Sequence, residues 1–167
     1  DKIAILISGS ISREDLEQIL LENIERNKEL SGLDRVNQII KRGDSIEVLL
    51  QEVCHALPAS WQYPKSTCVR LIYDNAVYTS SNFKVTPWTQ KQSFQVPGAA
   101  EGCLEIYYTS EFPERDEGPF LKEERSLLNN IAQLLSVAIG CKNHEQLIYE
   151  NRERLKELMA INRTTAL

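Results

Sequence analysis

The sequence predicts an α+β fold in which helices at both ends of the chain enclose a central antiparallel sheet. Three observations support this prediction. Apolar residues recur at helical spacing in the N-terminal part of the chain. Segments rich in β-forming residues, separated by turn signals, occupy the middle. A long amphipathic stretch without proline follows them, and this order of helices, strands and helix is typical of an α+β domain.

The N-terminal part predicts two helices. A sequence that resembles a capping box, with Asp in place of the usual Glu, begins at Ser12 and starts the first helix. Gly43 stops this helix. Asp44 or Ser45 caps the second helix, which Pro58 ends.

The middle of the chain predicts strands, and the remainder predicts one long helix. Strands are expected over residues 67–73, 77–79, 93–96 and 102–109. Residues 80–89 have no regular period, and residues 113–119 form a charged loop. From Phe120 the helical period resumes and continues toward the C-terminus.

The two ends of the chain contain an internal repeat. Residues 17–35 align with residues 145–163 at an offset of 128, with ten identities in 19 positions. Ordinary composition predicts roughly one such identity. One explanation of these identities is that any two charged helices of similar composition look alike. The other is that each unit consists of a linker helix and a domain, so that a second tandem unit begins near the C-terminus of an excised piece of a longer protein.

Four stretches carry a resemblance to a known family. They are residues 58–64 (Pro-Ala-Ser-Trp-Gln-Tyr-Pro), 68–70, 82–90 and 104–125. Over about residues 26–140 the chain resembles the GAF-type domains of bacterial and archaeal sensor histidine kinases and related multidomain regulators.

The resemblance implies a GAF-like central antiparallel sheet of five or six strands. It also implies that the N- and C-terminal helices pack on one face of the sheet, while the other face accommodates a small molecule. Accordingly, we expect an N-terminal linker helix over residues 1–25 and a GAF-like domain over residues 26–140. A C-terminal linker helix over residues 141–167 would start the second unit.

Strand alternation selects the candidate site residues. Alternation places Arg70 and Glu105 each on the side of its strand away from the residues that pack on the helices. The resemblance implies that these strands are neighbours and that this side is the pocket side, so the two residues are expected to form a polar anchor for a ligand or a structural ion pair. Trp61, Phe83 and Trp88 offer flat rings for stacking, or else fill the core. The candidate ligand-binding residues are Arg70, Glu105, Trp61, Phe83, Trp88, Cys68 and Tyr107.

Composition argues against several functions. The net charge of −5 and the pI of about 5.2 argue against a nucleic-acid partner. Four scattered cysteines without a C-x-x-C pair predict reduced core residues and a cytoplasmic location. No metal motif is present, and the ligand or cofactor stays unknown. No apolar run approaches the 18 residues of a membrane span, so no membrane contact is expected.

The terminal helices predict a partner. A heptad pattern joins Leu127, Leu134, Cys141, Ile148 and Leu155 with Asn130, Val137, His144, Asn151 and Leu158. We therefore expect a homodimer through the terminal helices. Its expected function is non-catalytic sensory regulation, in a two-component system for example, of a downstream output domain in the same chain.

Two alternatives to that function remain. One is a structural spacer or dimerisation module without a ligand. The other is an enzyme of methionine-sulfoxide-reductase type, against which the cysteines argue because all four lie in predicted helices or strands.

Overall fold

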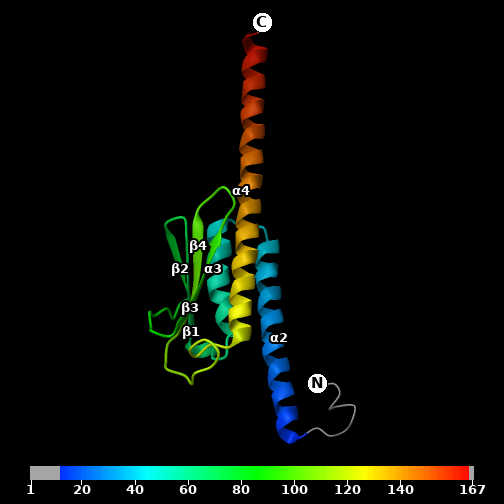
Figure 1. Ribbon diagram of the computed structural model, residues 1–167. Helices are drawn as coiled ribbons and strands as arrows, with labels where there is room; N and C mark the ends of the chain where they lie inside the picture. Colours follow the sequence, from blue (N-terminus) through cyan, green and yellow to red (C-terminus); the bar gives the residue numbers. More distant parts are fainter. Residues whose placement is uncertain (1–11, 166–167) are drawn as a thin grey trace.

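A computed structural model describes residues 12–165 and shows helices and strands in the expected order (Figure 1). The helices are α2 (Arg13–Lys41), α3 (Ile46–Ala56) and α4 (Lys122–Thr165), with the short 3-10 helices η1 (Leu57–Ser60) and η2 (Pro64–Ser66). The strands are β1 (Thr67–Tyr73), β2 (Ala76–Thr79), β3 (Thr89–Gln95) and β4 (Glu101–Tyr108). The first part of the expected N-terminal linker helix, residues 1–11, and the last two residues, 166–167, lie outside the described residues.

The strands form one antiparallel sheet in the order β2-β1-β4-β3. A tight turn joins β1 to β2, with positive φ angles at Asp74 (49°) and Asn75 (64°), as a type I′ hairpin turn requires. The expected five or six strands are wrong for the described residues, which form a sheet of four. The segment between β2 and β3 forms a loop over residues 80–88 and adds no strand.

The helices cover one face of the sheet (Figure 1). α3 and α4 pack against the strands, whereas α2 packs mainly on α3, η1 and α4 and forms an outer layer. Both terminal helices thus lie on the expected side, but only α4 packs directly on the sheet. α2 and α4 run side by side in the same direction, and the hydroxyl of Ser126 in α4 donates to the carboxylate of Glu29 in α2 (2.9 Å).

The hydrophobic core lies between the sheet and the helices. Its fully buried members include Leu50, Val53, Val69, Leu71, Leu104, Ile106, Leu128, Ile131 and Leu135. Burying one such side chain contributes about 1.5–3 kcal/mol, so this layer fixes the position of α4 on the sheet.

The helix boundaries follow the capping signals. Ser12 and Asp15 form the expected capping box, because the Ser12 hydroxyl accepts from the backbone N–H of Asp15 while the Asp15 side chain accepts from that of Ser12. Gly43 follows α2 with a φ of 73°. Ser45, not Asp44, is the N-cap of α3.

The first part of α2 and the last part of α4 extend from opposite ends of the domain (Figure 1). The two repeat segments, residues 17–35 and 145–163, are both helical as expected and lie within these helices. Each reproduces the same contacts within its helix. The Gln18–Glu22 hydrogen bond (3.2 Å) has its counterpart in Gln146–Glu150 (2.9 Å), and the Lys28–Glu25 ion pair (3.5 Å) in Lys156–Glu153 (3.0 Å).

Several sequence expectations need correction. β3 begins at Thr89, four residues before the expected start at residue 93. Leu127 is buried in its own domain and Leu134 is partly buried, so neither belongs to an exposed heptad seam. Cys141 is exposed, not a core residue. Among residues 12–165, no helix combines the length and the apolar character that crossing a membrane requires.

Candidate functional site

Side-chain alternation in the strands gives the sheet a helix-facing side and an outer side. On the helix-facing side Leu71 and Ile106 are fully buried. Arg70 and Glu105 lie opposite one another in the β1–β4 register and point to the outer side, as the sequence predicts. Five of the seven candidate residues gather there: Cys68, Arg70, Phe83, Glu105 and Tyr107.

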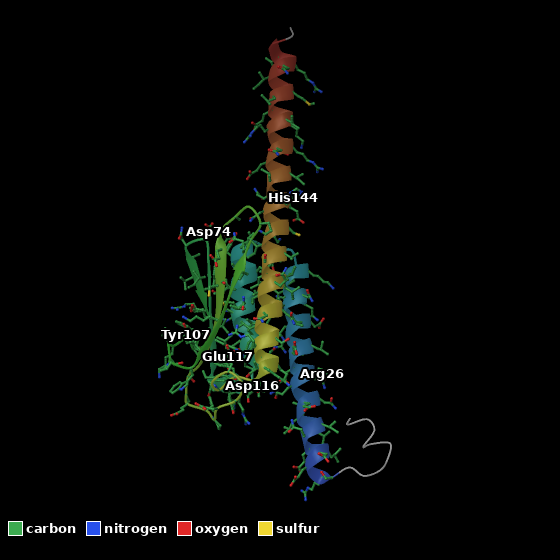
Figure 2. The ribbon with its side chains drawn as sticks, in the orientation of Figure 1. Arg26, Asp74, Tyr107, Asp116, Glu117 and His144 are labelled. Atoms are coloured by element: carbon green, nitrogen blue, oxygen red, sulfur yellow. The ribbon has the colours of Figure 1, made fainter. Side chains whose placement is uncertain are left out.

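The centre of this outer cluster is the Glu105 carboxylate, which is only 4% exposed. Its Oε1 accepts hydrogen bonds from Arg70 Nε (2.6 Å) and from the hydroxyl of Tyr107 (2.9 Å). Arg70 Nη2 also donates to the Tyr107 oxygen (3.1 Å). Lys91 Nζ lies 3.6 Å from Glu105 Oε2. Figure 2 labels Tyr107 on the sheet, away from the α2–α4 pair. One buried carboxylate is thus bound by two cations and a phenol.

The charges of the cluster shift its proton affinities. Burial of Glu105 works to raise the pKa of its carboxyl, but hydrogen bonds from Arg70 and Tyr107, with the charges of Arg70 and Lys91, bring that pKa below its usual range. The hydrogen bond to Glu105 raises the pKa of Arg70. Burial, followed by the hydrogen bond to Glu105, raises the pKa of Tyr107. At neutral pH Glu105 is therefore an anion, and the cluster is a stable ion pair.

The loop that follows β2 covers part of this cluster. The ring of Phe83 meets that of Tyr107 edge to face at 5.6 Å, and the guanidinium carbon of Arg70 lies 5.3 Å from the Phe83 ring centre. The side-chain amide of Asn82 donates to the carbonyl of Thr67 (3.0 Å) and anchors the loop. Arg70 therefore has a carboxylate, a phenol and an aromatic face as partners within its own domain.

The cysteines near the cluster are not activated. Cys68 is fully buried beneath the same loop, with its sulfur 3.4 Å from the carbonyl oxygen of Lys84. Burial raises the pKa of Cys68 and of Cys103. A nucleophilic cysteine needs a lowered pKa, so neither thiol has the environment of a catalytic residue.

The other two candidates, Trp61 and Trp88, lie on the helix-facing side. Trp88 packs against the hydrophobic core. Trp61 is fully buried, and its indole N–H donates to the side chain of Gln90 (2.9 Å). Gln90 in turn donates to Glu117 (2.7 Å), which is paired with Arg125 at the start of α4. The three aromatic residues therefore do not form one stacking surface; only Phe83 lies on the outer side.

A second polar cluster, which sequence reasoning missed, lies at the base of α4. Glu124 is 2% exposed and accepts four hydrogen bonds. They come from the backbone and the side-chain amide of Gln62 (2.9 and 2.8 Å), the hydroxyl of Tyr108 (2.8 Å) and the backbone of Leu121 (2.8 Å). Burial raises the pKa of both Glu124 and Tyr108. Gln62 and Glu124 lie in two of the stretches that carry the resemblance. Their presence in these motifs was the one feature of the sequence that could have pointed to this cluster.

Cavities lie elsewhere on the domain. One of about 390 Å³ lies beside the start of α3 and the β1–β2 turn, with Glu47, Asp74 and Tyr78 in its wall. Others of about 730 Å³ and 400 Å³ flank α4. None of these three includes Arg70 or Glu105. Within residues 12–165 no group of three His, Cys, Asp or Glu side chains is arranged to hold a metal ion.

Comparisons of the chain with protein-family models, with curated proteins and with solved structures give no match. The structure defines the class of the protein: a mixed helix and sheet domain with an antiparallel sheet and two long terminal helices. The resemblance to GAF-type domains rests on the sequence motifs alone.

Proposed function

We propose that this chain is a non-catalytic regulatory module of GAF type, which signals through its terminal helices to a downstream output domain. The observation that carries the proposal is the path of α2 and α4. They run side by side in one direction through the domain and leave it at opposite ends (Figure 1). A change in how the sheet holds α4 would therefore alter the position of one projecting helix relative to the other.

The contacts of α4 support this coupling. On one side its Leu128 and Ile131 belong to the core that it shares with the sheet. On the other side its Ser126 bonds to Glu29 of α2. α4 is thus in contact with both the sheet and the second helix, and α2 reaches the sheet mainly through α3, η1 and α4.

The internal repeat supports a serial arrangement. Residues 145–163 of α4 repeat the sequence of residues 17–35 of α2 and reproduce its internal contacts. As part of the proposal, this segment of α4 serves as the first helix of a second unit in tandem. The four cysteines, all free in the structure, fit the reducing environment of the cytoplasm.

A second candidate function is a structural spacer or dimerisation module without a ligand. The geometry of the outer cluster favours it, because Arg70, Glu105 and Tyr107 satisfy one another and none of the three cavities described above adjoins them. A ligand at this face would have to displace an internal partner of Arg70.

Native mass spectrometry of the protein purified from cells separates the two candidates. A ligand-sensing module is expected to carry a small molecule that is released on denaturation and is lost in an Arg70→Ala variant. The matched control is Arg42→Ala, which removes an exposed ion pair to Glu52 far along the sequence from the outer cluster. If the protein carries no bound mass and captures none from a cell extract, the spacer function is the correct one.

A further inference from the structure

α4 exposes a regular apolar seam after it leaves the core. Spacings of four and three residues alternate along it, which is the pattern of a two-stranded coiled coil. Val137, Leu155 and Leu158 are each more than half exposed, and Ile148 is 38% exposed. We define the α4 seam as Val137, Cys141, His144, Ile148, Asn151, Leu155 and Leu158.

α2 carries the corresponding seam at the other end of the domain. The α2 seam consists of Leu16, Leu20, Asn23, Asn27 and Leu30, all exposed or partly exposed. At the repeat offset of 128, Asn23 corresponds to Asn151. Both seams therefore carry an asparagine at the same position, although the α2 seam has a second one, Asn27, where the α4 seam has Leu155. A polar residue such as asparagine within the seam of a coiled coil fixes the register, at a cost in stability.

The surface beside the α4 seam has room for another helix. A cavity of about 730 Å³ separates α4 from the β3–β4 turn, and one of about 400 Å³ separates α4 from the end of α2. Val137 and Cys141 line both, so they form a ridge between two hollows. Pro97, Ala99 and Leu147 give the larger hollow apolar walls. Ridges that enter grooves are the way in which packed helices meet.

We propose that the occupant of the α4 seam is the α4 seam of a second copy of this chain, in parallel and in register. In this arrangement Asn151 meets Asn151 of the partner subunit, so that each amide finds a hydrogen-bonding partner inside an apolar interface. Because α2 and α4 run in the same direction, a two-fold axis along them can cover both seams, whereas an antiparallel α4 pair leaves the α2 seam uncovered. This inference rests on the proposed function in one respect: it takes the terminal helices as the part of the domain that passes the signal on.

A cysteine that the chain already possesses makes the geometry testable. Cys141 lies on the α4 seam and is exposed. In a parallel, in-register pair the two Cys141 residues face each other, within the Cα separation of about 4.4–6.8 Å that a disulfide allows. In the antiparallel pairing that places Asn151 opposite His144, Cys141 instead faces Leu155. The two cysteines are then about 21 Å apart along the helices, at 1.5 Å per residue.

The experiment is mild oxidation of the full chain with copper–phenanthroline at micromolar concentration, followed by a non-reducing gel. A covalent dimer is expected for the natural sequence and for Cys103→Ser, but not for Cys141→Ser. In the Cys141→Ser background, Ile148→Cys is expected to restore the cross-link. Glu150→Cys, on the opposite side of the same helical turn, is the matched control and is not expected to do so.

Sedimentation equilibrium of the reduced protein completes the test. The natural chain is expected to be a dimer, while Asn151→Leu is expected to lose its single stoichiometry and form mixed oligomers. A monomer at 100 micromolar overturns the inference. A dimer that does not cross-link through Cys141 overturns the parallel register even where Ile148→Cys cross-links, because Ile148 also lies opposite itself in the antiparallel pairing described above. A monomeric chain that retains a small molecule would refute this inference and leave the proposed function standing. A cross-linked dimer without a bound molecule would support this inference and count against the proposed function.

Discussion

Replacing Glu105 by glutamine tests whether the outer cluster contributes to stability as the geometry indicates. Glutamine keeps a carbonyl oxygen where Oε1 accepts from Arg70 and Tyr107. Both hydrogen bonds persist, but only the one from Tyr107 becomes neutral, and it falls from about 1.5–3 to about 0.5–1.5 kcal/mol. The bond from Arg70 keeps the charge of the guanidinium and loses the attraction of the ion pair, which costs up to about 1 kcal/mol more. The contact to Lys91, whose side chain is 51% exposed, is worth under about 1 kcal/mol. We expect the free energy of unfolding to decrease by about 2 kcal/mol, which lowers Tm by about 4–8 °C in a chain of this size.

The pH dependence of this effect has a defined sign. The pKa of Glu105 is lowered in the folded state, so its contribution is complete at neutral pH. It is lost as the pH falls below the ordinary Glu value of about 4.3 toward the folded pKa. Urea unfolding of the natural chain and of Glu105→Gln should therefore differ at pH 7 and converge in acid.

The matched control for Glu105→Gln is Glu101→Gln, an exposed carboxylate at the start of the same strand, with an expected change within about 0.5 kcal/mol. Removing the cation instead, with Arg70→Met, leaves a buried anion and should cost more, about 3–5 kcal/mol, with less than additive loss in the double variant. If Glu105→Gln unfolds with the same midpoint as Glu101→Gln at pH 7, the account of this cluster is wrong.

Three further predictions concern the core and the cysteines. Glu124→Gln should lower the free energy of unfolding by about 1–3 kcal/mol in urea titration, because an amide cannot accept all four hydrogen bonds; equal stability would contradict this. Gly102→Ala should lower Tm, since its Cβ would lie 2.3 Å from the Phe94 ring, at a cost of about 1–3 kcal/mol; an unchanged Tm would show that the ring yields freely. Burial raises the pKa of Cys54 to about 12, so iodoacetamide at pH 8 should modify exposed Cys141 first, as read by peptide mass spectrometry; early modification of Cys54 would contradict its burial.

Local chemistry explains why much of the fold is predictable from the sequence. Capping at Ser12 and Ser45 and the stop at Gly43 depend on residues adjacent in the chain. Strand alternation likewise depends on a period of two residues, which is why Arg70 and Glu105 could be placed on one face before their register was known.

The errors arise where partners are distant in the sequence. β3 is an edge strand whose buried Gln90 is satisfied by Trp61 and Glu117, so its first residues show no apolar alternation. The heptad period of α4 includes Leu127, which is buried in its own domain. A period identifies one face of a helix, but it does not say whether the same domain or another chain covers that face. The Glu124 cluster joins two motifs 62 residues apart, a distance at which sequence pattern carries no geometric information.

The close contact at Gly32 limits how two copies of this domain can associate. Because residues 145–163 repeat α2, exchange of helices between copies is a conceivable alternative to pairing of the seams. Gly32 is buried where α2 meets η1, and a Cβ there would lie 2.7 Å from Ser60 Oγ and 3.4 Å from Leu127 Cδ1. The repeat has Ala160 at this position, so the α4 segment would need Ser60 to move before it could replace α2 in an identical domain. A seam-to-seam pair meets no such obstacle, because its residues are exposed on helices that already extend beyond the core.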